Sequence, residues 1–596
     1  MLEISKYTPQ FIESKVPTIF ALARQSSSAS EFRNKLSQYA TRMEFEAFDD
    51  YESFSEGSII RVRDCSRILN RIITRRSENM ADFSVAQALY DVAVGTPRPD
   101  LTPAFFAEIF HLLLGLEGRG PGQTFTDIHL FKSIKSGRKA AQERSRQLNE
   151  LNAEMQLKLD RYASGLEHDA IKRRLKRRQH IISALKADEK DFANWQWQIN
   201  NILREPDVIS SLCVLSADEK KAIETARRKK LPFGITPYYL SLMDDDPEAG
   251  RDRAIRAQVI PPLSYVNEVN RTGGGRCFDF MLETDTSPVD LVTRRYPNIC
   301  ILKPFNTCPQ ICVYCQRNWE IEDAMEPEAM ASEAQIDKAI AWIKKNPAIH
   351  EVLVTGGDPL ALPTGELEII LDKISRIANV ERIRIGSRVP VTMPMRIDKE
   401  LTDTLARYRV WGRRQVALVT HVQHSYEITP DTLKAVKRLR KKGISVYNQL
   451  VYTFYISRRF EAAKLRRILS LIGIDPYYTF NTKGKEETHD YRVPIARLMQ
   501  EQKEEMRLLP GLARTDEAVY NVPGLGKNYL KARQHRDLIS ILPDGSRLYE
   551  FHPWEQNISA INTTFTNQDV PILEYLQRLE SYGEDASDYD TIWYYI

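Results

Sequence analysis

The apolar run ICILKPF at residues 299–305 decides the architecture, because it is the first of five short runs of the same kind. The others are HEVLVTGG (350–357), VERIRIGS (380–387), RQVALVTHV (414–422) and GISVYNQLVY (443–452). Between them lie stretches with the helical spacing of apolar residues, at 332–346, 364–377, 399–408 and 429–442. Strands that alternate with helices in this way predict parallel βαβ units, and therefore an α/β barrel or an open α/β sheet.

Polar residues follow the predicted strands at their carboxyl ends, where ligands gather in barrels and in open α/β sheets. They are Thr355 to Asp358, Ser387, Arg388, His421, Asn448 and Gln449. This edge of the sheet is therefore the predicted active face.

The composition is that of a cytoplasmic globular protein with more than one domain. The chain has 596 residues, of which 42% are hydrophobic and 28% charged, and it is too long for one ordinary core. No run approaches the ~18 apolar residues of a membrane span, and the N-terminus lacks the pattern of a signal peptide. Seven cysteines favour a reducing compartment over a disulfide framework. A net charge of +4 is too weak to predict nucleic-acid binding by the whole protein.

Changes in composition and in the spacing of apolar residues divide the chain into four predicted parts. Residues 1–190 form a mostly helical extension, which ends in a long charged stretch from about residue 138 to 188. Its basic run KRRLKRRQH at 172–180 is typical of a solvated helix face. A helical lead-in at 191–290, the barrel at 291–500 and a C-terminal segment at 501–596 follow. The sequence of the extension does not distinguish a dimerisation arm, a partner-binding module and a lid.

Three cysteines make the pattern Cys-x3-Cys-x2-Cys in CPQICVYC, directly after the first predicted strand. Three thiols at ligand spacing disfavour plain burial, whereas Cys300 lies within the apolar strand and is expected to be core. A structural zinc site needs a fourth protein ligand, and no cysteine follows Cys315. The remaining interpretation is an iron–sulfur cube held by Cys308, Cys312 and Cys315, which leaves one iron open to a chelating cosubstrate.

This cysteine pattern at the start of a βα array resembles that of the radical S-adenosylmethionine (SAM) enzymes. Further motifs narrow the resemblance to the lysine 2,3-aminomutase family. They are ITPYYLSLMDDDP (235–247), TRRYPN (293–298), TGGDPL (355–360), RIGSRVPVTMPMRI (384–397), THVQHSYEIT (420–429), NQLV (448–451) and PYYTFN (476–481). The resemblance implies a partial (βα)6 barrel of the radical SAM type.

In that family the open iron of a [4Fe–4S] cluster is chelated by SAM, so the resemblance implies both cofactors. Gly356, Gly357 and Asp358 match residues that line the methionine part of SAM, where paired glycines permit close backbone approach. His421 and Gln449 match further contacts of SAM. The resemblance also implies a small electron donor such as flavodoxin or ferredoxin as a partner.

A second cofactor is implied by NVPGLGKNYL at 521–530. A phosphate-binding P-loop needs a glycine and a Ser/Thr where this chain has Asn521 and Asn528, so that interpretation fails. The family instead has a glycine-rich loop that ends in a lysine, here Lys527. That lysine forms a Schiff base with pyridoxal 5′-phosphate (PLP).

The match to the family's PLP site is incomplete. Arg295 and Tyr296 match residues that serve PLP, but a further family arginine is Ile299 here. Contacts to the phosphate are therefore expected to be partly rearranged. The C-terminal cysteine cluster that binds zinc in lysine-type relatives is also missing, so no zinc is predicted.

The substrate prediction is based on charge. Arg317 matches the family arginine that pairs with the substrate α-carboxylate, for which a fork-shaped guanidinium is suited. Lysine-specific members hold the distant ammonium of lysine with two aspartates, and these positions are Lys483 and Asn521 here. A cation that faces an ammonium in a sealed pocket costs several kcal/mol, which disfavours lysine. Lys483 and Asn521 suit a side-chain carboxylate and resemble the pair in glutamate 2,3-aminomutases.

The resulting prediction is a homo-oligomeric 2,3-aminomutase, an isomerase that moves the α-amino group of L-glutamate to the β-carbon. Alternatives left open are another acidic or neutral amino acid, and a radical SAM enzyme that modifies RNA held by the basic helix. A regulatory protein that kept only the fold is disfavoured by the intact thiols, TGGD motif and lysine. The prediction requires that the amine of Lys527 and the three thiols meet across one shared cavity.

Overall fold

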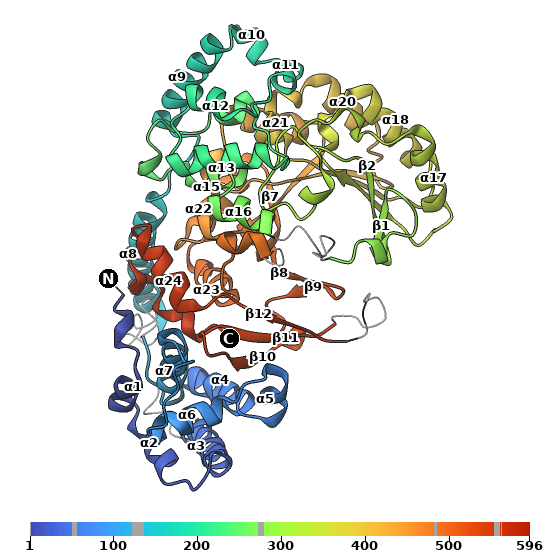
Figure 1. The fold of residues 1–596 in the computed structure, drawn as a ribbon. Helices are drawn as coiled ribbons and strands as arrows, with labels where there is room; N and C mark the ends of the chain where they lie inside the picture. Colours follow the sequence, from blue (N-terminus) through green and yellow to red (C-terminus); the bar gives the residue numbers. More distant parts are fainter. Residues whose placement is uncertain are drawn as a thin grey trace.

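A computed structural model describes residues 2–49, 56–121, 136–271, 279, 281–481, 486–553, 561 and 563–596. The chain forms a large α/β unit, at the top in Figure 1, and a smaller unit below it. In the smaller unit the first helices of the chain meet its last strands.

The large unit is built on a nine-stranded sheet whose strands lie side by side in chain order from β1 to β9. Their bounds are β1 (Val292–Tyr296), β2 (Ile299–Phe305), β3 (Glu351–Gly356), β4 (Arg382–Gly386), β5 (Gln415–Thr420), β6 (Ser445–Tyr452), β7 (Asp475–Asn481), β8 (Glu517–Val522) and β9 (Gly526–Tyr529). Strands β2 to β8 are parallel, whereas β1 and β9 pair antiparallel at the two edges. The sheet curves into a nearly closed barrel, which confirms the predicted α/β barrel class.

Helices follow the strands β2 to β7 and complete the six predicted βα units. They are α17 (Glu333–Lys344), α18 (Thr364–Ser375), α20 (Lys399–Arg407), α21 (Pro430–Lys441), α22 (Glu461–Ile472) and α23 (Ile495–Glu504), with the short α19 (Val389–Thr392) before α20. Successive residues of a strand point alternately to the helices outside the sheet and to the barrel interior. Val352 and Val354 are buried in the same apolar core as Ile336 of α17, while Leu353 between them points into the barrel. Cys300 is 1% exposed in this core, as predicted.

The C-terminal segment adds two strands to the barrel that the sequence did not predict. β8 pairs with β7, and β9 folds back on β8 as a hairpin that contains Lys527. The predicted PLP lysine is therefore part of the barrel sheet itself.

The smaller unit joins the two ends of the chain. It contains α1 (Pro9–Lys15), α2 (Pro17–Arg24), α3 (Ala29–Asp49), α4 (Glu56–Ile72), α5 (Arg75–Ala81), α6 (Val85–Ala93), α7 (Pro103–Leu116), the sheet β10 (Arg536–Ile541), β11 (Arg547–Phe551) and β12 (Phe565–Gln568), and α24 (Ile572–Ser581). Glu108 of α7 pairs with Arg547 of β11 at 3.0 Å. His111 of α7 stacks on Trp593 with ring centroids 4.4 Å apart. These buried contacts hold the N-terminal helices against the C-terminal sheet.

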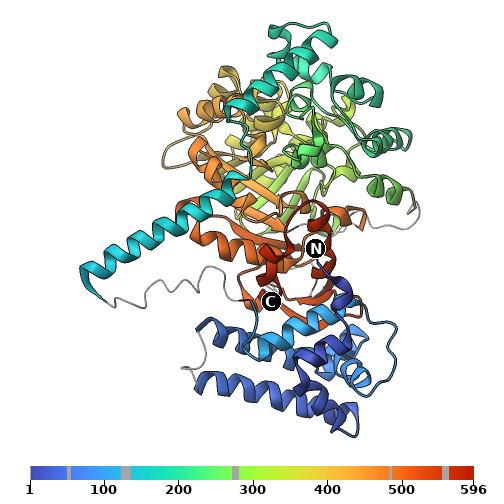
Figure 2. The ribbon, with the colours of Figure 1, turned by 90° about the vertical axis from the view of Figure 1, so that its left-hand side faces the viewer.

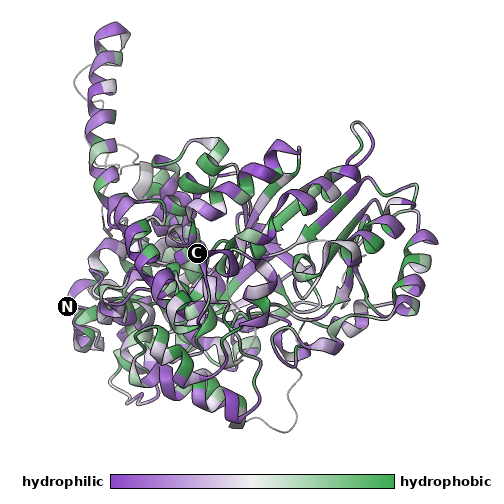
Figure 3. Ribbon diagram, turned by 90° about the horizontal axis from the view of Figure 1, so that it is seen from above, coloured by the Kyte–Doolittle hydropathy of each residue, from purple (hydrophilic) through white to green (hydrophobic). Residues whose placement is uncertain are grey.

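Helices α8 (Gly137–Asp160) and α9 (His168–Ala184) connect the two units. Figure 2 shows α8 projecting from the body, and Figure 3 shows that it is mostly hydrophilic. The basic run on α9 is only in part the solvated face that the sequence predicted, since Lys172 and Lys176 are exposed. Arg174 and Arg177 are buried, with Arg174 bonded to the carbonyl of Tyr426 and Arg177 to Asp245. These arginines hold the helix against the barrel because each finds an oxygen partner there.

Short helices cover the barrel before β1. They are α10 (Glu189–Phe192), α11 (Trp195–Asn200), α12 (Pro206–Leu212), α13 (Ala217–Arg228), α14 (Pro237–Leu240), α15 (Arg253–Val259) and α16 (Leu263–Arg271). Among the described residues, no helix has both the length and the apolar character needed to cross a membrane.

Candidate active site

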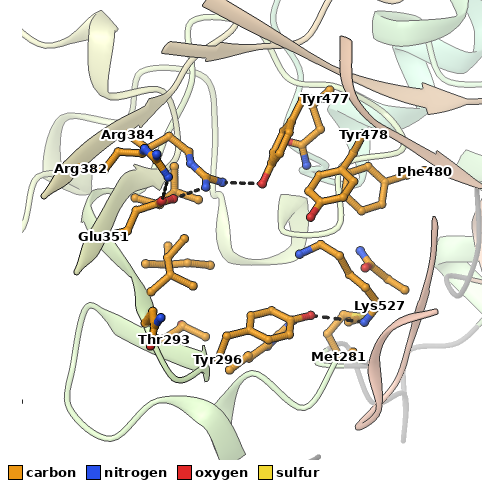
Figure 4. Close-up of a pocket in the computed structure, with 18 of the residues that line it drawn as sticks. Met281, Thr293, Tyr296, Glu351, Arg382, Arg384, Tyr477, Tyr478, Phe480 and Lys527 are labelled. Carbon is orange, nitrogen blue, oxygen red and sulfur yellow. Dashed lines mark hydrogen bonds and ion pairs between the residues drawn. The ribbon is translucent and has the colours of Figure 1, made fainter. Parts of the chain in front are cut away.

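The concave side of the sheet encloses a cavity of about 610 Å³. Every strand of the barrel sheet except β5 contributes lining residues. Five residues that the sequence assigned to cofactors or substrate line this one cavity, namely Arg295, Tyr296, Gln449, Asn521 and Lys527. Figure 4 shows the side chain of Lys527 extending into this space between Tyr296 and Tyr478.

The local sequence explains how Lys527 reaches the cavity. Residues 523–525 form the turn of the β8–β9 hairpin, because Val522 pairs with Gly526. Gly524 and Gly526 have φ angles of +69° and +83°, which glycine adopts without strain. The turn places Lys527 directly opposite Asn521, with both side chains on the barrel interior.

The amine of Lys527 is enclosed by aromatic rings and faces two guanidiniums. Its Nζ lies 4.7 Å from the ring centroid of Tyr296 and 4.8 Å from that of Tyr478. Burial lowers the pKa of Lys527 to about 8, and the nearby charges of Arg384 and Arg295 act in the same direction. A lysine with this pKa supplies the neutral amine that Schiff-base chemistry needs at physiological pH.

One end of the cavity contains a network of charged groups. Glu351 pairs with Arg384 and, at 2.7 Å, with Arg382. Arg384 also donates to the hydroxyl of Tyr477 at 3.2 Å. Figure 4 shows Arg384 on the far side of the cavity from Lys527.

The three cysteines lie together in the loop that follows β2, and all three are free and partly exposed. Burial raises the pKa of Cys308, and Asp358 and the other two thiols add to this effect. Three thiols in one loop fit a multi-iron cluster, in which each cysteine binds a different iron.

A buried arginine anchors the cysteine loop. Nη1 of Arg388 lies 3.0 Å from the sulfur of Cys312. Nη2 donates to the hydroxyl of Tyr239 at 2.9 Å and to the carboxylate of Glu427 at 2.8 Å. Arg388, whose charge is balanced by Glu427, thus lies beside Cys312, one of the predicted iron ligands. The sequence identified it only as a polar residue at a strand end.

The two glycines of TGGD press against the start of the cysteine loop. The N–H of Gly357 donates to the carbonyl of Phe305 at 2.7 Å. A Cβ on Gly357 would lie 2.0 Å from the carbonyl oxygen of Thr307, and one on Gly356 would lie 3.0 Å from that of Phe305. These glycines therefore let the cysteine loop pack closely against the end of β3, and their contact with SAM stays a prediction.

The carboxylate of Asp358 is used within the barrel rim. It accepts hydrogen bonds from the backbone N–H of Leu360 at 3.1 Å and of Arg388 at 2.8 Å. Asp358 thereby ties the end of β3 to the end of β4. Its contact with SAM stays a prediction.

His421 connects the cavity to the cysteine loop. Its Nδ1 lies 2.7 Å from the carbonyl oxygen of Gln449, and its Nε2 lies 2.8 Å from the hydroxyl of Tyr314. Burial and the charge of Arg388 lower the pKa of His421 to about 4, so the ring is neutral at physiological pH. Because a carbonyl only accepts, Nδ1 holds the ring proton. Gln449 lines the cavity and Tyr314 precedes Cys315, so this chain of contacts spans the two regions.

Arg317 is paired within the protein. It bonds to Glu283 and to Glu320, and Glu283 also bonds to Lys303. Burial alone would raise the pKa of Glu283, but Arg317 and Lys303 lower it to about 2. Thr293 adds a hydrogen bond to Glu283 at 3.1 Å. The carboxylate of Glu283 therefore already occupies the place beside Arg317 where the resemblance implies the substrate α-carboxylate.

The predicted residues thus fall into two neighbouring groups. The cavity is lined by Arg295, Tyr296, Asn521 and Lys527, and also by Gln449, which the sequence assigned to SAM. The thiols, the TGGD residues, His421 and Arg317 do not line this cavity and lie at or after the carboxyl ends of their strands. Lys483 lies outside the described residues. Sequence reasoning missed Lys303, although a charged residue inside the apolar strand β2 was a usable signal. It also missed Glu283 and Tyr478, for which no local pattern exists.

Comparisons with known proteins complete the description. A family model described as the radical SAM superfamily matches residues 302–458. An uncharacterized KamA family protein of Methanocaldococcus jannaschii is 40% identical over 98% of this chain and 97% of its own. Glutamate 2,3-aminomutase of Clostridioides difficile is 33% identical over 58% of this chain and 79% of its own. L-lysine 2,3-aminomutase of Fusobacterium nucleatum subsp. nucleatum is 32% identical over 52% of this chain and 69% of its own.

Proposed function

The chain belongs to the KamA family of radical SAM proteins, and on that premise we propose that it is a PLP-dependent 2,3-aminomutase acting on L-glutamate. The radical SAM family implies SAM and a [4Fe–4S] cluster. The similarity to glutamate and lysine 2,3-aminomutases supports an isomerase that moves an amino group between neighbouring carbons. We further propose a homo-oligomer in the cytoplasm that receives electrons from a small donor such as flavodoxin or ferredoxin.

The observation that supports PLP is the position of Lys527. Its side chain is half-buried and extends into the barrel cavity, its pKa is lowered, and Arg295 and Tyr296 line the same cavity. An amine with a lowered pKa is suited to attack the aldehyde of PLP, and the guanidinium of Arg295 is suited to bind its anionic phosphate. A surface lysine would instead have an ordinary pKa and no enclosing rings.

The cysteine loop fits the second cofactor system, since it offers three thiols and leaves one iron for SAM. When bound, the cluster with SAM supplies the radical and PLP supplies the carbonyl that together permit the amino group to move. The residues of this chain supply position and exclusion of water. Lys527 acts as the attachment point, and Tyr296 and Tyr478 enclose its amine.

Arg317 and Lys303 would orient the amino acid beside the cysteine loop. In the described structure their partner is Glu283. Substrate carboxylate would compete with this side chain for the same two cations, by the same charge-assisted hydrogen bonds.

The charges of the described cavity support an acidic substrate. Asn521, which lies beside Lys527, has no charge, and Glu351 is already shared by two arginines. The ammonium of lysine would meet Arg295 and Arg384, and the lining carboxylates are Glu351, which two arginines share, and Glu381, which lies 3.3 Å from the ring of His350. A second carboxylate, as in glutamate, would be attracted to the same surroundings.

An anaerobic assay of cluster-reconstituted protein with a panel of amino acids tests this proposal. We expect β-glutamate to form from L-glutamate, as detected by mass and retention, and no β-lysine to form from lysine. Lys527→Ala serves as the control that removes PLP attachment and activity while the cluster still assembles. Conversion of lysine with no conversion of glutamate would refute the substrate assignment.

Only part of the basic helix is available to contact RNA, since its exposed basic residues include Lys172 and Lys176 but not two of its arginines. Arg174 and Arg177 are buried in contacts with the rest of the protein. They are not available to contact a phosphate backbone.

A further inference from the structure

We propose that Arg384 binds the phosphate of PLP in this chain and takes over the role left open by Ile299. The inference rests on the PLP site proposed above and goes beyond it by naming the anion-binding residue. Arg384 begins the motif RIGSRVPVTMPMRI (384–397), to which the sequence alone assigned no role.

The register of the sheet shows how the positions are related. Ile299 of β2 pairs with Glu351 of β3, which pairs with Arg382 of β4. Two residues further along each strand, Ile301 pairs with Leu353, which pairs with Arg384. All of these residues line the cavity. An arginine at position 299 would thus lie at the same end of the cavity as Arg382 and Arg384. In this chain the guanidiniums at that end come from β4 instead.

Of the two arginines on β4, Arg384 is the one enclosed in the cavity. Its side chain is 16% exposed, whereas that of Arg382 is 47% exposed. Arg382 also donates to Gln415 at 2.8 Å, away from the cavity lining. Arg384 instead bonds to Tyr477, which lines the cavity wall beside Tyr478. Its position lets it act electrostatically on the amine of Lys527.

The charges around the amine leave room for an anion. Arg295 of β1 and Arg384 of β4 both line the cavity, and Glu283 lies 3.9 Å from Arg295. The carboxylate nearest to Arg384 is Glu351, which it shares with Arg382. A guanidinium has five N–H donors, so the contacts with Glu351 and Tyr477 leave donors for a further acceptor. Two guanidiniums around a dianionic phosphate make the strong, charge-assisted arrangement that such groups favour.

Binding of PLP and of pyridoxal, which lacks the phosphate, tests the assignment without any need for an active cluster. Each compound is titrated into the purified full-length chain, and attachment to Lys527 is followed by absorbance and by mass after borohydride reduction. The variant is Arg384→Met, with Arg384→Lys as a milder second variant. The matched control is Arg382→Met, which removes the neighbouring arginine that shares Glu351.

We expect the wild-type chain to prefer PLP over pyridoxal. Arg384→Met should weaken PLP binding about 10- to 100-fold and leave pyridoxal binding nearly unchanged. Arg384→Lys should keep part of the preference, and Arg382→Met should keep nearly all of it. If Arg384→Met keeps the wild-type preference, or Arg382→Met loses as much, the assignment of Arg384 is wrong while the PLP site stands. If the wild-type chain binds neither compound at Lys527, the proposed function itself fails.

Discussion

Asn521 and Lys527 lie directly opposite each other across the β8–β9 hairpin, and both side chains line the barrel cavity. Opposed residues of an antiparallel pair point to the same face of the sheet. The residue at position 521 is therefore a fixed neighbour of the amine of Lys527. This pairing links the chemistry of the lysine to a position that the sequence assigned to substrate selection.

The lowered pKa of Lys527 predicts the pH dependence of aldehyde attachment. The reactive form is the neutral amine, so attachment should accelerate as pH rises through about 8. An ordinary lysine would be less than about 1% neutral at pH 8. The rate of pyridoxal attachment, measured by stopped-flow absorbance from pH 6 to 10, provides the test. A midpoint near the ordinary lysine value would show that the amine is not enclosed as described.

Asn521→Asp should raise that midpoint. A carboxylate opposite Lys527 stabilises the ammonium form, so the pKa of the lysine should rise by about one unit or more. The same pH titration with pyridoxal measures the change. Asn521→Ala, which adds no charge, is the control and should leave the midpoint near that of the wild type. Equal midpoints for the aspartate and alanine variants would contradict the cross-strand proximity of the two side chains.

Each of the three loop cysteines should be required for iron binding. Cys308→Ala, Cys312→Ala and Cys315→Ala should each reduce the iron and sulfide bound after anaerobic reconstitution, because a cube held by two protein thiols is easily lost. Cys300→Ala is the matched control, since Cys300 is buried in β2 away from the loop. It should keep its iron and lose about 1 kcal/mol of stability. Full iron content in any of the three loop variants would show that the cysteine is not a ligand.

Local patterns predicted the barrel because each βα unit has its own signals. The apolar run of β2 and the capping box of Ser332 and Gln335 at the start of α17 are both local features. The thiols and Lys527 were also recognisable, since their spacing and flanking glycines lie within short segments. Glu283 could not be predicted, because its role depends on cations brought to it from β2 and from the cysteine loop.

The same distinction explains why the burial of Arg174 and Arg177 on the basic helix was not predicted. A run of arginines is usually solvated, and the sequence of α9 contains no sign of its partners. Arg174 finds the carbonyl of Tyr426, which lies far along the chain. Buried arginines of this kind can be identified only when the acceptors are known.

Gly357→Ala should disturb the cysteine loop more than its size suggests. The added Cβ would lie 2.0 Å from the carbonyl oxygen of Thr307, a backbone atom that cannot rotate away. The loop must therefore shift, which should cost more than about 2 kcal/mol of stability and lower the iron bound after reconstitution. Gly365→Ala is the matched control, because nothing lies within 4 Å of its Cβ position. It begins α18, where alanine is a better helix former than glycine, so its stability should be unchanged or slightly higher. Thermal unfolding and iron content are measured on both variants. Equal results for the two would show that the contact between the TGGD segment and the cysteine loop is dispensable.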